Sequence, residues 1–408
     1  MITKKLASSP MLYMSSGSKE LFHSNFLYWL GTNYRDKFQI LMTRLLSIAS
    51  QWPDEWILHR EFLHLDLCVT YKKEKEKKNS KGKKSTEECV FIIIENKVKS
   101  LPDIVQLKRY EQLFNGRQNG CHYAVLSLVK GFYGNEIINK KSTWKLHYYD
   151  ELAKQIEDLF KGNDVKPEHI TYIKDYCLYV HDLSKLANSW KVNDNEQFLQ
   201  ETTSLKELRL NDIYEKIRYA QVAAMLAQEL ENTLAPNANG EPKVVLGMSN
   251  ADVILRRGRA DADKILSFYG CPNADIYSQV FISSGMSHGV GLMEAKVKVE
   301  DDCCLVLQVQ GNRYCHGIER QNIVHNSTSL SEWLQNFIEF KFGGLPYHKS
   351  QPDSKQCHYK DGFIYKSQKI DSSATVRNIV DALRNDIEII LETKPNTVLK
   401  NKTHHDTN

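Results

Sequence analysis

Hydrophobic residues near the start of the chain recur at helical spacing. Over residues 18–31, large apolar side chains return every three or four positions, which predicts an amphipathic helix. Residues 36–50 repeat this spacing and predict a second helix. From Trp56 to Tyr71 the pattern changes to that of a strand. The first part of the chain is therefore expected to combine helices with strands.

Within the strand-like stretch, residues 62–69 alternate between the two faces of a strand. One predicted face is apolar and consists of Leu63, Leu65, Leu67 and Val69. The opposite face carries Asp66. The lysine-rich residues 71–89 then predict an exposed hairpin tip, and residues 89–97 predict a buried strand.

The following segments continue this mixed pattern. A helix is expected over residues 100–115, because Ser100 is a suitable N-cap and Asn115-Gly116 a suitable end. Strands are expected over residues 121–129 and 144–149, and helices over residues 150–160 and 168–182. The polar region 185–206 predicts a boundary between a first domain, residues 1–190, and a second domain, residues 207–408.

The second domain is expected to belong to the α+β class. It begins with a long helical pattern over residues 207–234 and becomes strand-rich over residues 243–310. Two late helices are expected, over residues 329–341 and 374–392. A domain of this kind could select the substrate or mediate assembly, and both roles stay open.

The composition is that of a folded protein without a membrane span. Of the 408 residues, 41% are hydrophobic and 25% are charged. The longest apolar runs are strand-sized and far shorter than the roughly 20 residues of a spanning helix. The N-terminal residues lack the apolar core of a secretory signal, and the nine scattered cysteines indicate reduced thiols. We therefore expect a cytoplasmic protein with no membrane partner.

The formal net charge of +4 comes from a single segment. Residues 71–89 contain eight lysines and four glutamates, and the remaining basic and acidic residues cancel. The lysines could contact the phosphate backbone of a nucleic acid. They could equally keep a strand edge soluble, and the two interpretations carry equal weight because no aromatic residues are interleaved with the lysines.

Five polar side chains occupy consecutive elements of the first domain. Asp66 projects from one strand, whereas Glu95 and Lys97, two positions apart, project from one face of the next strand. Gln106 and Tyr110 are four positions apart and lie on one side of the following helix. We expect the three charged residues at a solvated strand end, because a charge inside an apolar strand is unfavourable unless a metal, a partner or solvent receives it.

If the two strands are neighbours, Asp66 and Glu95 can bind one cation together. Two carboxylates, a backbone carbonyl and waters are oxygen ligands that suit Mg²⁺ or Mn²⁺. The metal would lower the pKa of a bound water and polarise a phosphoryl oxygen. Lys97 would orient that water or offset the negative charge that develops at phosphorus.

This arrangement resembles the PD-(D/E)XK nuclease superfamily, which has the fold of restriction endonucleases. The resemblance covers about residues 15–150, and the spacing Gln106-x-x-x-Tyr110 is similar to that of its RecB-like members. It implies an α/β fold with a restriction-endonuclease-like core, in the order α-β-β-β-α-β, followed by the C-terminal α+β domain. It also implies that Gln106 and Tyr110 brace the site or contact the substrate strand.

The segment Glu20-Leu21-Phe22-His23-Ser24-Asn25 is similar to the first helix of an uncharacterised bacterial branch of this superfamily. In that branch an acidic residue on this helix can join the metal site. The resemblance therefore implies that Glu20 is an accessory ligand or orients metal-bound water. The chain departs from the motif at Leu65, which replaces a proline, and in the long interval of residues 67–94.

The expected function is metal-dependent hydrolysis of nucleic-acid phosphodiester bonds by a nuclease, with DNA favoured as the substrate. Endonuclease and exonuclease action both stay open. The protein partner could be a second copy in a homodimer or a protein of a defence system. The alternative is a non-cleaving nucleic-acid-binding or regulatory protein that retains the nuclease fold. The intact set of Asp66, Glu95 and Lys97 argues against it. A purely structural interaction protein is expected only if these residues do not converge.

Several weaker features have ordinary explanations beside functional ones. His23 could lie near the metal, although a helix histidine satisfied by a neighbour is favoured. Cys303-Cys304 and Cys315-His316 could suggest zinc, but without a C-x₂-C pair buried thiols are favoured. Arg256-Arg257-Gly258-Arg259 could contact phosphate, with a solvated turn favoured. Residues 285–291, with three glycines, favour a hairpin turn over a phosphate loop.

Overall fold

The computed structural model describes most of the chain, in two compact units. The described residues are 2–15, 19–49, 51–63, 65–78, 84–98, 104–115, 121–131, 143–162, 164–235, 244–246, 279–300, 303–320, 334, 337, 357–359 and 362–393. The first unit consists of Met1–Trp190 and Thr203–Ile217. The second consists of Lys191–Thr202 and Arg218–Asn408.

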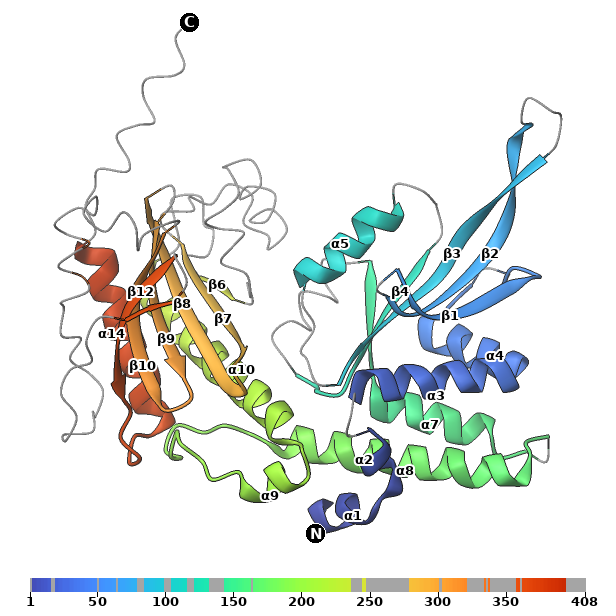
Figure 1. Cartoon of the computed structure of the whole chain (residues 1–408), viewed down its shortest axis with the longest axis horizontal. Coiled ribbons are helices and arrows are strands. Elements are labelled where there is room, and N and C mark those ends of the chain that lie inside the picture. Colours follow the sequence, from blue (N-terminus) through green and yellow to red (C-terminus); the bar gives the residue numbers. More distant parts are fainter. Residues whose placement is uncertain are drawn as a thin grey trace, which may run out of the picture. The chain divides into compact units, whose positions relative to one another are not determined.

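The first unit is built around a five-stranded sheet in the order β1-β2-β3-β4-β5 (Figure 1). Its strands are β1 (Trp56–Phe62), β2 (Leu65–Lys78), β3 (Lys84–Lys97), β4 (His122–Ser127) and β5 (Trp144–Tyr148). β1, β2 and β3 pair antiparallel, whereas β3, β4 and β5 pair in parallel. The accompanying helices are α1 (Ile2–Ser8), α2 (Pro10–Ser15), α3 (Lys19–Asn33), α4 (Arg35–Leu46), α5 (Ile104–Asn115), α7 (Tyr149–Leu159), α8 (Pro167–Ser189) and α9 (Thr203–Glu207).

Helices lie on both faces of this sheet. α3, α4 and α7 cover one face, with α8 packed behind α7 on the same side, and α5 lies on the other face (Figure 1). The core under the four helices includes Leu67, Ile92 and Ile94, so the intervening residues of β2 and β3 point toward α5. β3 is thus buried on both faces, which explains its nearly continuous apolar run. The predicted order of a helix, three strands, a helix and a strand is confirmed.

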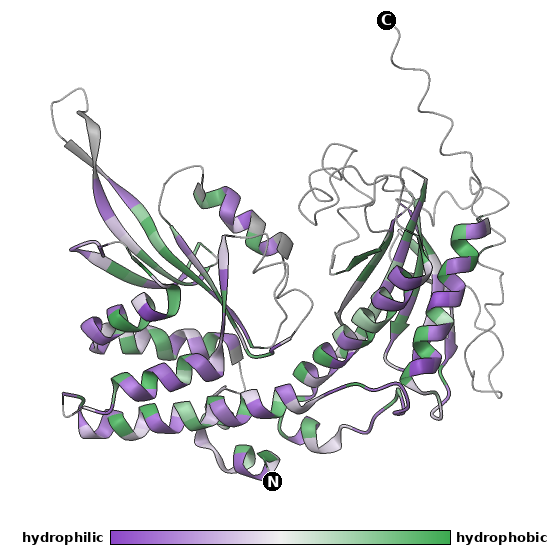
Figure 2. Cartoon of the chain, turned by 180° about the vertical axis from the view of Figure 1, so that it is seen from behind, coloured by the Kyte–Doolittle hydropathy of each residue, from purple (hydrophilic) through white to green (hydrophobic). Residues whose placement is uncertain are grey.

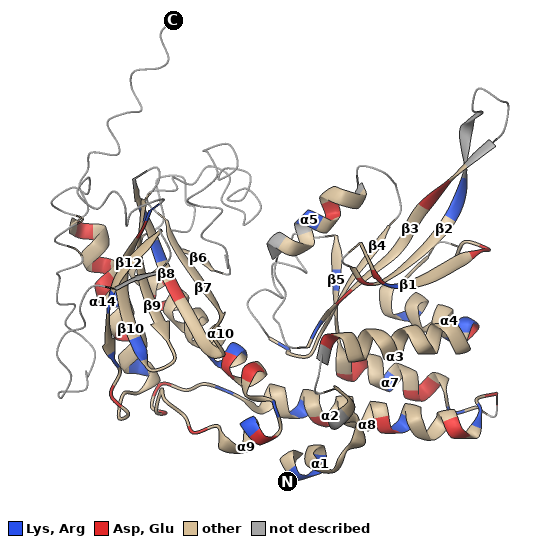
Figure 3. Cartoon of the chain, in the orientation of Figure 1, with Lys and Arg blue, Asp and Glu red and all other residues tan. Residues whose placement is uncertain are grey.

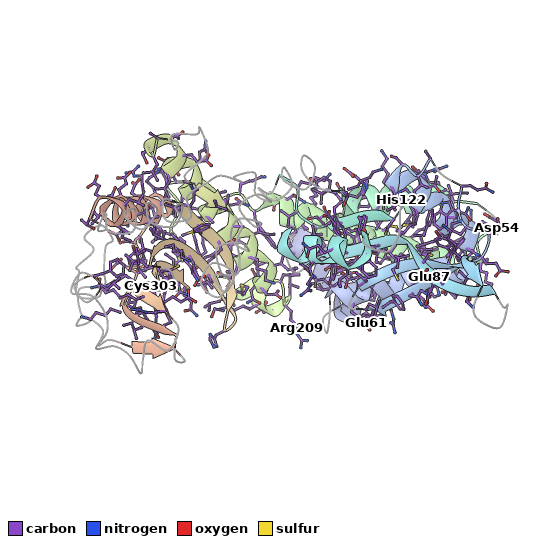
Figure 4. All side chains as sticks on the ribbon, turned by 90° about the horizontal axis from the view of Figure 1, so that it is seen from above. Asp54, Glu61, Glu87, His122, Arg209 and Cys303 are labelled. Atoms are coloured by element: carbon purple, nitrogen blue, oxygen red, sulfur yellow. The ribbon has the colours of Figure 1, made fainter. Side chains whose placement is uncertain are left out.

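The strand pattern over residues 62–69 conceals a hairpin turn. Phe62 pairs with Leu65 across the β1–β2 ladder, so the chain reverses between them. Glu61 (labelled in Figure 4) and Leu63 have positive φ angles of 53° and 51°. The assignment of Leu63 to the apolar face is therefore wrong, because this residue lies in the turn and is 58% exposed. Apolar residues alternate with other residues over positions 62–69, but the alternation at Leu63 does not reflect strand structure.

The lysine-rich residues on either side of 79–83 extend the β2–β3 ladder. Backbone pairing continues as far as Lys78 and Lys84, and the hairpin projects beyond the rest of the sheet (Figure 1). Lys72 lies opposite Glu88, and Lys73 lies opposite Glu87. Figure 3 shows these opposite charges on the outer part of the two strands. Cross-strand pairs of this kind favour the ladder, so the glutamates balance part of the lysine charge.

Several predicted elements differ from the observed ones at their ends. α5 is described from Ile104, and the predicted cap Ser100 lies outside the described residues. α8 runs to Ser189, well beyond residue 182, and so enters the polar region that predicts a boundary. α1 and α2 have no counterpart among the predicted elements. Both are shorter than eight residues, too short to establish a helical period.

The second unit contains a seven-stranded sheet in the order β11-β12-β10-β9-β8-β7-β6. Its strands are β6 (Val244–Leu246), β7 (Val280–Ser287), β8 (Val290–Glu300), β9 (Cys303–Gln310), β10 (Arg313–Arg320), β11 (Cys357–Tyr359) and β12 (Phe363–Lys369). All neighbours pair antiparallel except β6 and β7, which are parallel. Helices α10 (Asn211–Thr233) and α14 (Val376–Thr393) are described as well, and the boundary between the units falls within α10.

The apolar faces of α10 and α14 pack against this second sheet. Leu226 of α10 and Ile379 of α14 share one core with Val297 and Leu305 of the strands. Figure 2 shows hydrophobic and hydrophilic residues alternating along both helices, as amphipathic helices on a sheet require. One carboxyl group, that of Asp386 on α14, is buried in this core.

Several predictions for the second unit fall on residues outside the described ranges. These are the basic turn Arg256-Arg257-Gly258-Arg259 and, except for residues 334 and 337, the predicted helix over residues 329–341. None of the described helices is long and apolar enough to cross a membrane.

Candidate active site

Asp66 lies where the β2–β3 ladder opens. The last backbone pair on that side joins Leu67 to Ile94, so Asp66 and Glu95 come directly after the end of regular pairing. The backbone N–H of Asn96 donates instead to Oδ2 of Asp66, at 2.6 Å. A carboxylate thus takes the place of a ladder carbonyl and is anchored to the neighbouring strand.

Glu95 and Lys97 form a buried ion pair on the face of β3 that points toward α5. Lys97 Nζ lies 2.7 Å from Oε1 of Glu95, and the two residues are 6% and 3% exposed. The expectation of a solvated strand end is therefore wrong for both. Burial beneath α5 explains the difference, since the helix covers the end of the strand. The second oxygen, Glu95 Oε2, is buried and has no hydrogen-bond partner among the described residues.

Gln106 and Tyr110 complete the arrangement from α5. The amide nitrogen of Gln106 donates to Oε1 of Glu95 at 2.8 Å, and its amide oxygen accepts from Lys97 at 2.8 Å. The same nitrogen lies 3.0 Å from the Tyr110 hydroxyl. The helical spacing thus brings both residues to the strand pair, with Gln106 in direct contact and Tyr110 behind it.

Burial raises the pKa values of both carboxyl groups of this site. Burial and the neighbouring Glu95 charge raise the pKa of Asp66 to about 7, against the hydrogen bond from Asn96. Burial also raises the pKa of Glu95, in opposition to Lys97. For Lys97, burial would lower the pKa, but the Glu95 carboxylate more than compensates and raises it.

Glu20 belongs to the same electrostatic cluster although it comes from α3. Its charge helps to raise the pKa of Asp66, Glu95 and Lys97. Glu20 lies in the first turn of the helix, where an acidic side chain is favoured by the helix dipole. All six residues singled out in the sequence are therefore near one another.

His23, three residues after Glu20, lies in a different environment. Its ring is fully buried among aromatic side chains, and Nδ1 lies 2.8 Å from the Tyr176 hydroxyl. Burial lowers the pKa of His23 to about 3, so the imidazole is neutral. The residue belongs to the packing between α3 and α8.

Three buried polar residues beside the site have no counterpart in the sequence interpretation. Ser24 and Tyr149 are each hydrogen-bonded to Asn96, on the face of the sheet opposite the ion pair. One signal was available for Asn96, which stands in the apolar row formed by Ile92 and Ile94. Ser24 and Tyr149 offered no comparable signal.

In the second unit, the cysteines noted in the sequence lie buried on strands, and the glycine-containing segment includes a tight turn. Cys303 (labelled in Figure 4), Cys304 and Cys315 are buried free thiols on neighbouring strands. Burial raises the pKa of Cys304 to about 12, which favours the protonated thiol over a metal-binding thiolate. His288 and Gly289 form the tight turn between β7 and β8, with φ angles of 50° and 80°.

Comparison with known protein families agrees with this geometry. A family model described as the PD-(D/E)XK nuclease superfamily matches residues 58–178. The matched range contains Asp66, Glu95, Lys97, Gln106 and Tyr110, whereas Glu20 precedes it. No curated protein and no solved structure matches the chain. Over residues 58–178, within its first unit, the chain is therefore similar to the PD-(D/E)XK nuclease superfamily.

Proposed function

We propose that this protein is a divalent-metal-dependent nuclease that hydrolyses phosphodiester bonds of DNA. The observation that carries the proposal is the Glu95 carboxylate. One of its oxygens is shared by Lys97 and Gln106, while the other is buried without a hydrogen-bond partner among the described residues, beside a second carboxyl group, that of Asp66. A buried carboxylate oxygen without a hydrogen-bond donor is unfavourable, and a bound cation would stabilise it.

The donor set fits a hard divalent cation. Asp66 and Glu95 supply oxygen ligands only, which suit Mg²⁺ or Mn²⁺ and not a thiolate-binding metal. Burial and the neighbouring Glu95 charge raise the pKa of Asp66, and a bound cation would stabilise its carboxylate against both effects. Within the described residues there is no group of three or more His, Cys, Asp or Glu arranged to hold a metal. Water, substrate oxygens and a backbone carbonyl would therefore supply the other ligands, as Mg²⁺ sites commonly require.

The protein side chains would divide the work as follows. Asp66 and Glu95 would hold the cation, which supplies Lewis acidity and positive charge for attack on phosphorus. Lys97 has three N–H donors, and two of them meet Glu95 and Gln106. The third can donate to the attacking water or to a phosphate oxygen. Gln106 fixes the direction of the ammonium, Tyr110 supports Gln106, and Glu20 would orient water at the edge of the site.

DNA is proposed as the substrate because the resemblance is to restriction-endonuclease-like folds. Endonuclease action is proposed for the same reason. Covalently closed circular DNA tests both points together, because an exonuclease cannot begin on a circle. Parallel reactions measure whether linear DNA and single-stranded RNA are cleaved faster or more slowly than circular DNA.

The test is cleavage by purified full-length protein with Mg²⁺, with Mn²⁺ and with EDTA. We expect cleavage with either metal, none with EDTA, and a loss of at least 100-fold in Glu95→Gln and Lys97→Met. Glu88→Gln is the matched control, because Glu88 lies on the same strand but is exposed. Substrate binding without cleavage under all conditions would favour the alternative of a non-cleaving nucleic-acid-binding protein.

A further inference from the structure

Asn96, between the two residues of the buried ion pair, points away from them. Its neighbours on that face of β3 are Ile92 and Ile94, which belong to the apolar core under α3, α4, α7 and α8. Asn96 is completely buried among them. An apolar residue would suit this position better unless the amide has specific partners.

Both ends of the Asn96 amide are hydrogen-bonded to residues from other elements. Its Nδ2 donates to Ser24 Oγ of α3 at 2.7 Å, and its Oδ1 accepts from the Tyr149 hydroxyl at 2.8 Å. Tyr149 is the first residue of α7 and is itself fully buried. The amide thus connects the strand of the ion pair to two helices.

The same residue also holds Asp66 through its backbone. The Asn96 N–H donates to Asp66 Oδ2, so the side chain and the backbone of one residue fix the two sides of the site. Ser24 adds a third connection, since its hydroxyl donates to the carbonyl of Glu20 at 3.1 Å. Asp66, Glu95 and the turn that carries Glu20 are therefore joined through Asn96 and Ser24.

We propose that Asn96, Ser24 and Tyr149 are positioning residues that hold the carboxylates of Asp66 and Glu95 at the separation required to bind one divalent cation. This inference rests on the proposed function. None of the three contacts the cation or the substrate, and they act through Asp66, Glu95 and Glu20. Residues that orient metal ligands in this way typically change metal affinity about 10- to 100-fold when they are altered.

The experiment measures the binding of Mn²⁺ alone to the full-length protein, by calorimetry or electron paramagnetic resonance, without nucleic acid. Tyr149→Phe removes the hydroxyl that meets Asn96, and Ser24→Ala removes the other partner. Tyr179→Phe is the matched control, because Tyr179 is equally buried but its hydroxyl meets Ser15 at 2.8 Å. Thermal unfolding of each variant reports whether the fold is retained. Ser24→Ala provides the test if Tyr149→Phe does not fold.

We expect Mn²⁺ binding about tenfold or more weaker in Tyr149→Phe and in Ser24→Ala, and unchanged in Tyr179→Phe. The double variant should lose less than the product of the two single losses, because both substitutions act through Asn96. Asp66→Asn separates this inference from the proposed function. If Asp66→Asn abolishes binding while Tyr149→Phe and Ser24→Ala bind like the control, the inference is overturned and the metal site stands. If the wild type binds no Mn²⁺, both are overturned.

Discussion

Gln106 donates to the same oxygen of Glu95 that accepts the hydrogen bond from Lys97. The distances are 2.8 Å and 2.7 Å, and the amide oxygen of Gln106 in turn accepts from Lys97. The three side chains form a closed ring of hydrogen bonds. This ring fixes the ammonium of Lys97 and leaves the second Glu95 oxygen available to a cation.

The first prediction concerns Gln106. Gln106→Ala opens the ring, so we expect cleavage to fall by about tenfold or more while the free energy of unfolding changes by roughly 1 kcal/mol. The measurements are kcat at saturating metal and thermal unfolding. Gln112→Ala is the matched control, because it is the same substitution at an exposed position of α5. Equal activity of Gln106→Ala and the control would remove Gln106 from the site.

The second prediction is that Asp66→Asn makes the protein inactive but more stable in EDTA above pH 7. Burial and Glu95 raise the pKa of Asp66 to about 7, from an ordinary value of 3.8. The folded state therefore favours the protonated carboxyl. The resulting stability is fully present below about pH 4 and is lost as the pH rises through 7. The asparagine carries no charge at any pH and avoids this loss.

Thermal unfolding at pH 5 and pH 8 tests this prediction. The difference in melting temperature between Asp66→Asn and wild type should be larger at pH 8 in EDTA. Added Mn²⁺ should stabilise the wild type and not the variant, because a ligand stabilises only the state that binds it. A variant less stable than wild type in EDTA at pH 8 would show that the Asp66 carboxylate is needed for the fold itself.

The third prediction concerns the buried carboxyl group of Asp386 in the second unit, where no catalytic residue is proposed. Asp386 accepts a hydrogen bond from Tyr314, yet burial raises the pKa of the carboxyl to about 7. Its contribution to stability is present below about pH 4 and is lost as the pH rises through 7. Asp386→Asn should therefore raise the melting temperature of this unit at pH 8 more than at pH 5.

Glu392→Gln is the control for that experiment, because it replaces an exposed carboxyl on the same helix. It should leave the pH dependence of unfolding unchanged. An Asp386→Asn variant with the pH dependence of wild type would mean that the Tyr314 hydrogen bond keeps the Asp386 carboxylate charged in the folded state.

The parts of the site that depend on local periodicity could be predicted from the sequence. Two positions along a strand place Glu95 and Lys97 on one face, and four positions along a helix place Gln106 beside Tyr110. The turn at Leu63 could not be predicted, because its positive φ angle occurs without a glycine or asparagine to indicate it.

The hydrogen bonds of Asn96 could not be predicted from the local sequence pattern. Its partners Ser24 and Tyr149 are 72 and 53 positions away in the chain. Only the packing of α3 and α7 against one face of the sheet brings them together. The burial of Glu95 and Lys97 has the same origin, since it depends on where α5 lies and not on the sequence of β3.

The last prediction concerns the projecting β2–β3 hairpin and separates binding from catalysis. The net charge of the chain resides in residues 71–89, most of which form the outer parts of β2 and β3, the strands that carry Asp66 and Glu95. Each lysine that meets a phosphate of duplex DNA releases about 0.9 counterion, so log K should fall steeply with log salt. A short Gly/Ser turn in place of residues 72–84 should weaken DNA binding and flatten that slope, while cleavage of bound DNA continues.

The control keeps the hairpin but replaces its lysines with glutamine, and it should show the same loss of slope. An unchanged slope in both variants would mean that the lysines only keep the hairpin soluble, and that the DNA-binding surface lies in the second unit.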